Sequence, residues 1–138
     1  MRSGRVLALD PGSRRVGVAV SDPLGMTAQP HSVLDAEDPD LMGKIARLGA
    51  ELGVERIVVG LPVSLNGTEG PAAASARRFA ATVAGATGLP VDFADERFTS
   101  VSAERVLVEA GLSGRRRRAV RDRVAAAILL QAYLDGGR

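Results

Sequence analysis

The sequence predicts an α/β protein in which a mixed β-sheet is covered by helices, and three observations indicate this class. The chain opens with two apolar runs joined by a Pro-Gly turn, which is the pattern of a hairpin. Beyond residue 38, helical and strand-like patterns alternate, as in parallel strands joined by helical crossovers. The 138 residues, 46% of them apolar, contain no linker or internal repeat, so residues 1–138 are expected to form one domain.

The hairpin occupies residues 5–22. Its first strand, Val6–Leu9, is an apolar run suited to burial on both faces, and residues 16–20 form a β-branched return strand. Pro11-Gly12 supplies the turn between them, because proline presets φ and glycine accepts positive φ. Asp10 ends the first strand, and from the hairpin alone its carboxylate is as consistent with a turn cap as with a catalytic group.

The other elements follow from apolar periodicity and from the residues that interrupt it. Asp38 and Pro39 suit the N-cap and first position of a helix, and Gly53, Gly88 and Gly111 each end a helical pattern. In chain order we expect a short strand at 31–34, a helix from 38 to about 53, a strand at 54–61, a helix from 71 to about 86, a strand at 90–95, a short helix at 102–110 and a last helix at about 118–134.

Acidic residues follow two of these strands. If the strands after each helix run parallel to the first strand, the carboxyl ends of all three lie at one edge of the sheet, where open α/β sheets place their sites. That edge carries Asp10 and Asp95-Glu96, roughly 10 Å apart at the backbone if the strand at 54–61 lies between them. The strand pattern does not separate Asp95 from Glu96. Asp22 ends the return strand at the opposite edge and is interpreted as a turn residue.

A third acid lies in the last helix. Residues 124–130 are almost wholly apolar, which predicts burial, and Asp122 shares a helical face with Ala125, Ala126 and Leu129. An inward carboxylate needs a metal, an arginine or hydrogen bonds, whereas an acid in the first turn can simply favour the helix dipole. With no cysteine and one histidine in the chain, a carboxylate set suits a hard cation such as Mg²⁺.

Positive charge is concentrated in one segment. Residues 114–123 hold six arginines and one acid, leaving 12 basic and 15 acidic residues elsewhere. Such a cluster indicates contact with a polyanion, although a solvated arginine-rich helix end would look the same. The lack of cysteine fits a cytoplasmic protein, and no apolar run approaches the ~20 residues that span a bilayer, so no membrane association is expected.

Four ordered segments together resemble the YqgF family, also called RuvX, of Holliday junction resolvases or nucleases that process pre-16S rRNA. The segments are LALDPGSRRVGVAVSD at 7–22, GLPVSLNGTEG at 60–70, DERFTS at 95–100 and RRRRAVRDRVAAAILLQAYL at 115–134. One minor departure is Phe98-Thr99-Ser100, where the family usually has Leu-Thr-Thr. The resemblance implies an RNase H-like fold, a five-stranded mixed sheet of order 3-2-1-4-5 flanked by helices, and a metal-dependent phosphodiesterase site.

The resemblance also implies site residues. It makes Asp10, Glu96 and Asp122 the catalytic acids and the ligands of Mg²⁺ or Mn²⁺, and so favours Glu96 over Asp95. The expected nucleic-acid contacts are arginines in the first motif, in the DER motif and in the basic run: Arg14, Arg97, Arg115, Arg116, Arg117, Arg118 and Arg121.

Three functions remain open at this point. The favoured one is a metal-dependent endonuclease on structured nucleic acid, with processing of the 5′ end of pre-16S rRNA ahead of resolution of branched DNA. The second is a nucleic-acid-binding module without catalysis. The third is a phosphotransferase of the actin and sugar-kinase type, which the length disfavours because those proteins close two such domains over ATP. A monomer is favoured.

Overall fold

The computed structural model of the chain describes residues 4–64, 66–96 and 114–136, and within the last helix its side chains from Arg123 onward. Its elements are β1 (Arg5–Pro11), β2 (Arg15–Ser21), β3 (Ala28–Asp35), α1 (Leu41–Leu52), β4 (Val54–Leu61), α2 (Pro71–Thr87), β5 (Val91–Asp95) and α4 (Gly114–Leu134). The helix expected at 102–110 and Arg97 lie outside the described residues. No helix in the described part of the chain is both long and apolar enough to cross a membrane.

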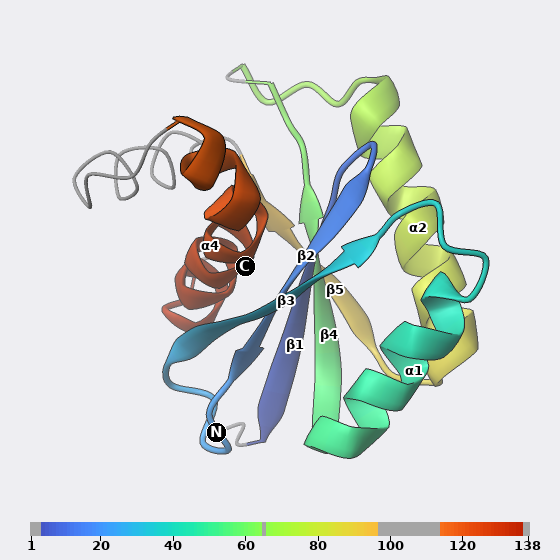
Figure 1. Cartoon of the computed structure of the whole chain (residues 1–138), viewed down its shortest axis with the longest axis vertical. Helices are drawn as coiled ribbons and strands as arrows, with labels where there is room; N and C mark the ends of the chain where they lie inside the picture. Colours follow the sequence, from blue (N-terminus) through green and yellow to red (C-terminus); the bar gives the residue numbers. More distant parts are fainter. Residues whose placement is uncertain (1–3, 65, 97–113, 137–138) are drawn as a thin grey trace.

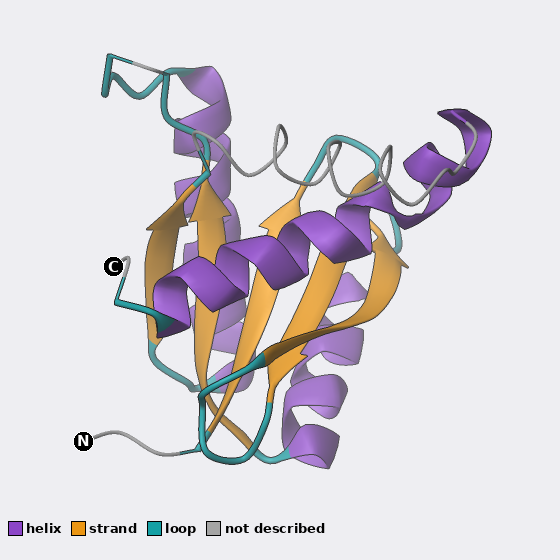
Figure 2. Ribbon diagram, turned by 90° about the vertical axis from the view of Figure 1, so that its left-hand side faces the viewer, coloured by secondary structure: helices purple, strands orange, loops and turns teal. Residues whose placement is uncertain are grey.

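The five strands form one sheet of order β3-β2-β1-β4-β5, which confirms the predicted order. β1 pairs antiparallel with β2 and parallel with β4, and β4 pairs parallel with β5. The carboxyl ends of β1, β4 and β5 therefore lie at one edge, as expected. Helices α1 and α2 cover one face of this sheet and α4 covers the other (Figure 1); Figure 2 shows α4 lying across its face.

Both faces of the sheet are packed, and the side chains of β1 alternate between them. On the α1/α2 face, Leu7 and Leu9 join a buried cluster that includes Ile45 of α1. On the α4 face, Ala8 packs in a second cluster with Leu129 of α4. Burial on both faces explains why β1 reads as a continuous apolar run rather than as an alternating one.

Two helices begin at residues other than those predicted. Helix α1 starts at Leu41, with Asp40 as its N-cap residue, because the carbonyl of Asp38 accepts the N–H of Leu41 in a separate turn and the carbonyl of Asp40 accepts the N–H of Lys44. Helix α4 starts at Gly114, so the run 115–118 lies inside the helix rather than ahead of it. Arginine is a good helix former, and nothing after Gly114 interrupts the helix.

Polar contacts tie α4 to the sheet at its carboxyl-terminal half. The hydroxyl of Tyr133, whose side chain is buried, donates to Asp92 Oδ2 at 2.6 Å and accepts from Arg56 Nη1 at 3.0 Å. Gln131 accepts the N–H of Ala28 at 2.9 Å through its side-chain oxygen. These bonds to β3, β4 and β5 fix the position of α4 over the sheet.

Candidate functional site

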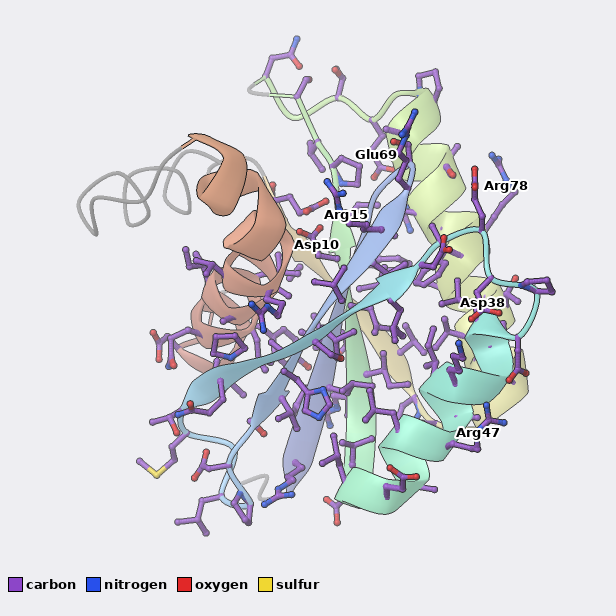
Figure 3. The ribbon with its side chains drawn as sticks, in the orientation of Figure 1. Asp10, Arg15, Asp38, Arg47, Glu69 and Arg78 are labelled. Atoms are coloured by element: carbon purple, nitrogen blue, oxygen red, sulfur yellow. The ribbon has the colours of Figure 1, made fainter. Side chains whose placement is uncertain are left out.

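Asp10 lies near the carboxyl end of β1, where the first hairpin turns. It pairs with Gly17 of β2, and the N–H of Gly12 donates to the carbonyl of Arg15 at 2.8 Å, which closes the turn. Figure 3 shows Asp10 at this end of the hairpin. Its side chain is half-buried, so the hairpin holds a carboxylate at the rim of the core.

Glu96 follows β5 directly and extends its pairing with β4. Its N–H donates to the carbonyl of Leu61 at 3.1 Å. Its side chain lies against Gly60, where an added Cβ would stand only 2.7 Å from Cδ of Glu96. Gly60 therefore leaves the space through which Glu96 reaches β1, and the carboxyl of Glu96 forms a hydrogen bond with Asp10.

Alternation along the strands explains why Glu96 meets Asp10 and Asp95 does not. Successive side chains of a strand point to opposite faces of the sheet. Ala8 of β1 and Ala94 of β5 both pack on the α4 face, so Asp10 and Glu96, each two residues further on, lie on that face as well. By the same alternation Asp95 lies on the opposite face of the sheet, and it is exposed. This geometry separates the two acids that the strand pattern left open.

The surroundings of Glu96 favour its protonated form. Burial raises the pKa of Glu96 to about 9, and the hydrogen bond and charge of Asp10 and the charge of Asp95 add to the effect. Two ionised carboxyls this close repel each other, which favours the protonated form of Glu96.

The donor chemistry of the pair fits a hard divalent cation. Both groups offer oxygen ligands, and a cation would replace the shared proton as the counter-charge. Within residues 4–64, 66–96 and the described side chains of α4, no group of three or more His, Cys, Asp or Glu side chains is arranged to hold a metal. Asp122 belongs to α4, and its side chain lies outside the described ones. The residues three, four and seven positions after it, Ala125, Ala126 and Leu129, are buried, as the periodicity predicted.

The expected nucleic-acid contacts are described to different extents. Arg14 is exposed on the hairpin turn, and its carbonyl accepts the N–H of Ala36 at 2.9 Å. The backbones of 115–118 and of Arg121 lie in α4, and their side chains are outside the described ones. Asp22 has a different role: its carboxylate accepts the N–H groups of Met26 at 2.7 Å and Thr27 at 2.8 Å, so it is a turn residue, as predicted.

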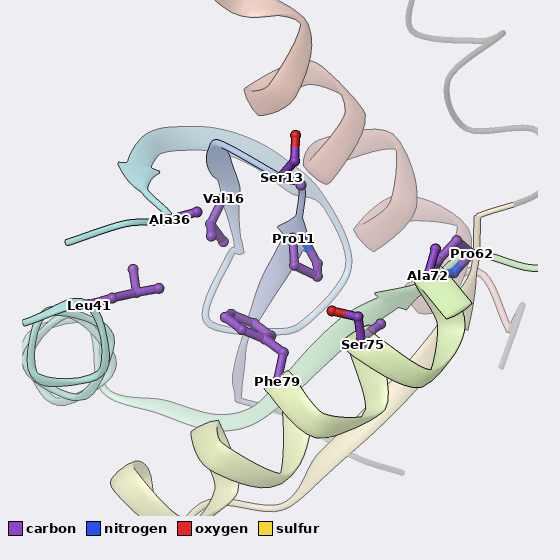
Figure 4. A pocket seen from close by; sticks show the side chains of 11 residues that line it. Pro11, Ser13, Val16, Ala36, Leu41, Pro62, Ala72, Ser75 and Phe79 are labelled. Atoms are coloured by element: carbon purple, nitrogen blue, oxygen red, sulfur yellow. The ribbon is translucent and has the colours of Figure 1, made fainter. Parts of the chain in front are cut away.

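Two features of the site were not predicted from the sequence. One is the space at Gly60, which an unexplained glycine inside an apolar strand could have indicated. The other is a cavity of about 480 Å³ on the α1/α2 face, at the same edge of the sheet (Figure 4). Ser75 and Phe79, spaced by one helical turn on α2, line it.

The sheet order and the helices on its two faces define an RNase H-like fold. The chain is similar to Thermus thermophilus RuvC in complex with a Holliday junction substrate, with a TM-score of 0.57, 18% identity and coverage of 95% of this chain and 93% of that one. A second Thermus thermophilus RuvC structure gives a TM-score of 0.51 at 15% identity, covering 96% of each chain. At this identity the likeness establishes the fold alone.

The sequence comparisons identify the family. The model of RuvX, described as Holliday junction resolvase, matches residues 4–136, and the chain belongs to that family. A Syntrophomonas wolfei relative is 50% identical over 135 residues, which cover 96% of this chain and 95% of the relative. A Moorella thermoacetica relative is 50% identical over 133 residues, covering 95% and 94%. Both relatives carry the name "Putative pre-16S rRNA nuclease". These findings confirm the resemblance seen in the four segments.

Proposed function

We propose that this protein is a divalent-metal-dependent endonuclease that cleaves structured nucleic acid, with precursor 16S rRNA as its substrate. The observation that carries the proposal is the contact between the carboxyls of Glu96 and Asp10 at the carboxyl edge of the sheet. Membership of the RuvX family and the nuclease names of its relatives support the reaction class.

In this proposal Asp10, Glu96 and Asp122 hold Mg²⁺ or Mn²⁺. When bound, the metal supplies an activated water and charge stabilisation for an in-line attack on phosphorus. Asp10 would contribute a ligand whose backbone the hairpin fixes, and Glu96, once deprotonated, would contribute a second carboxylate. Asp122 would add the third carboxylate from α4, the helix whose buried face already packs on this side of the sheet.

The arginines would position the substrate rather than react with it. Arg115, Arg116, Arg117, Arg118 and Arg121 lie in the same helix as Asp122, ahead of its buried half. Arginine side chains bind phosphate oxygens and so fix the register of a nucleic acid without reading its bases. We assign Arg14, in the hairpin turn that follows Asp10, and Arg97, directly after Glu96 in the sequence, to the same role.

Branched DNA is the second candidate substrate. The family model is described as Holliday junction resolvase, which favours a four-way junction. The relatives at 50% identity are named for pre-16S rRNA, and we give RNA precedence on that ground.

The test compares the wild-type protein with Asp10→Asn on a precursor 16S rRNA fragment and on a four-way DNA junction, with Mg²⁺, Mn²⁺ or EDTA. Cleavage of the RNA that needs a metal and is lost in Asp10→Asn supports the proposal, provided that both proteins unfold at similar temperatures. Cleavage of the four-way junction but not of the RNA would show that branched DNA is the substrate. If both proteins bind the nucleic acid equally well, with a strong dependence on salt, and neither cleaves it, the protein would be a nucleic-acid-binding module rather than an enzyme.

A further inference from the structure

The cavity on the α1/α2 face borders the acid pair at the ends of two strands, β1 and β4. Pro11, which lines it, follows Asp10, and Pro62, which also lines it, follows Leu61, the residue whose carbonyl binds the Glu96 N–H. Neighbouring residues of a strand face opposite sides of the sheet. The acids therefore lie on the α4 side of the edge, and the cavity opens directly across it.

The walls of the cavity are apolar, with two hydroxyls. Phe79 projects from α2 into it between Leu41 and Pro11, and Figure 4 shows Ser75 one turn earlier on the same side of the helix. Ser13 stands at the hairpin turn. Among the described residues that line the cavity, none carries a charge.

This lining suits an uncharged planar ring better than a phosphate. An aromatic wall stacks on the face of a nucleobase, and serine hydroxyls can donate to or accept from its polar edge. Acidic residues flank the lining residue Ala36 on both sides: Asp35 and Glu37 are its neighbours and are exposed. Arg14 and Arg15 flank the lining residues Ser13 and Val16 in the same way, so the charges around the cavity are mixed. The uncharged lining itself disfavours a phosphate inside the cavity. The volume of about 480 Å³ falls within the range of small-molecule sites, roughly 300–1,000 Å³.

We infer that this cavity is a base-binding subsite, which receives an unpaired nucleobase from the strand whose phosphate lies at Asp10 and Glu96. The inference rests on the proposed function. A nucleic-acid strand that crosses this edge of the β-sheet would have its phosphate on the α4 side. The adjacent base would then lie past Pro11 and stack on Phe79. The subsite would therefore select for single-stranded or unpaired nucleotides next to the cleaved bond.

The experiment fills the cavity and measures base-dependent affinity. Ser75→Phe places a ring in the cavity from an exposed helix position, and Ala74→Phe adds the same ring at the neighbouring exposed residue, outside the cavity. Binding to a 12-nucleotide oligoadenylate and to an abasic ribose-phosphate oligomer of equal length is measured in Ca²⁺, which takes carboxylate ligands, and a gel checks that the oligomers stay intact. The wild type and Ala74→Phe should bind the oligoadenylate roughly 5- to 100-fold more tightly than the abasic oligomer. Ser75→Phe should lose that difference and keep its affinity for the abasic oligomer.

A second measurement does not depend on a variant. Photo-crosslinking of wild-type protein to an oligomer that carries 4-thiouridine should attach it to the peptide that contains Phe79. Equal base preference in Ser75→Phe and Ala74→Phe, crosslinks confined to other peptides, or binding of free AMP as tight as that of the oligomer would each overturn the inference. Metal-dependent cleavage lost in Asp10→Asn would stand unaffected by those results, so the proposed function is judged separately.

Discussion

The carboxyl of Glu96 reaches Asp10 across the backbone of Gly60, so three strand ends together make the acid pair. β1 supplies one acid, the residue after β5 supplies the other, and β4 supplies the gap between them. A side chain at position 60 would occupy the space that Glu96 needs. The acid pair therefore depends on a residue that carries no functional group.

Gly60→Ala is expected to impair cleavage by at least tenfold. The new Cβ would lie 2.7 Å from Cδ of Glu96, so the carboxyl must move away from Asp10. Overpacking of this kind costs about 1–3 kcal/mol of unfolding free energy, less if Glu96 swings toward solvent. Cleavage rates and urea unfolding measure the two effects. Gly85→Ala is the matched control, because a Cβ there meets nothing within 4 Å. Equal activity in both variants would contradict the role given to Gly60.

The stability of the metal-free protein is expected to fall as pH rises from about 5 to 9. The pKa of Glu96 is raised from 4.5 to about 9, so in this window the folded chain keeps a proton that the unfolded chain has released. The free energy of unfolding then decreases by at most about 1.4 kcal/mol per pH unit. Asp22, Asp38 and Glu69 have lowered pKa values, so their contributions are lost only at acid pH, below this window.

Glu96→Gln provides the comparison for that pH dependence. Glutamine keeps the shape and can still donate to Asp10, but it has no proton to lose. Urea unfolding in EDTA at pH 5, 7 and 9 should give a flatter profile for the variant than for the wild type. Parallel profiles would show that Glu96 is already ionised at pH 7 in the folded protein.

Mg²⁺ or Mn²⁺ is expected to raise the melting temperature of the wild type. A ligand that binds only the folded state stabilises it by about 2.7 kcal/mol at one hundred times its dissociation constant. Asp10→Asn should reduce the shift strongly. Asp22→Asn is the control, because its carboxylate is bound to backbone N–H groups at the other end of the hairpin and should not affect metal binding. Equal shifts in melting temperature in the two variants would show that the metal does not bind at Asp10.

Tyr133→Phe is expected to destabilise the fold by about 1–3 kcal/mol. The change removes a buried hydroxyl and leaves Asp92 and Arg56 without that partner. Because these bonds fix α4 on the sheet, cleavage should also weaken if Asp122 acts from that helix. A double-mutant cycle with Asp92→Asn measures the coupling, and additive effects in it would show that the two side chains do not stabilise the fold together.

The mixed sheet and the shared strand edge could be predicted from the sequence because apolar runs, turn glycines and the alternation of helices and strands indicate them. The sheet order 3-2-1-4-5 followed from the resemblance to the YqgF family. Strand β4 was predicted with its observed bounds, since Val54–Leu61 is apolar and flanked by Gly53 and Pro62. The start of α4 was placed at residue 118 because four consecutive arginines carry no apolar period, although they form a helix readily.

The contact between Asp10 and Glu96 could not be predicted from the sequence alone, because it depends on how the strands lie in space. In the sequence Asp95 and Glu96 are equally good candidates for a contact with Asp10. The structure distinguishes them, because Ala94 packs on the α4 face and alternation then places Glu96 on that face and Asp95 on the other. Gly60 and the cavity beside Phe79 depend on which atoms of distant elements approach each other, and no local pattern encodes that. The prediction of Asp38 as an N-cap was wrong by two residues, because Asp38 closes a turn with Leu41 and the helix begins only after Asp40.

The most direct measurement is anomalous diffraction from crystals of the wild-type protein soaked in Mn²⁺. The proposed function predicts manganese density in contact with the carboxylates of Asp10, Glu96 and Asp122. A map without manganese at this edge, with Glu96 still hydrogen-bonded to Asp10 and Asp122 paired with an arginine, would contradict a metal-dependent nuclease site.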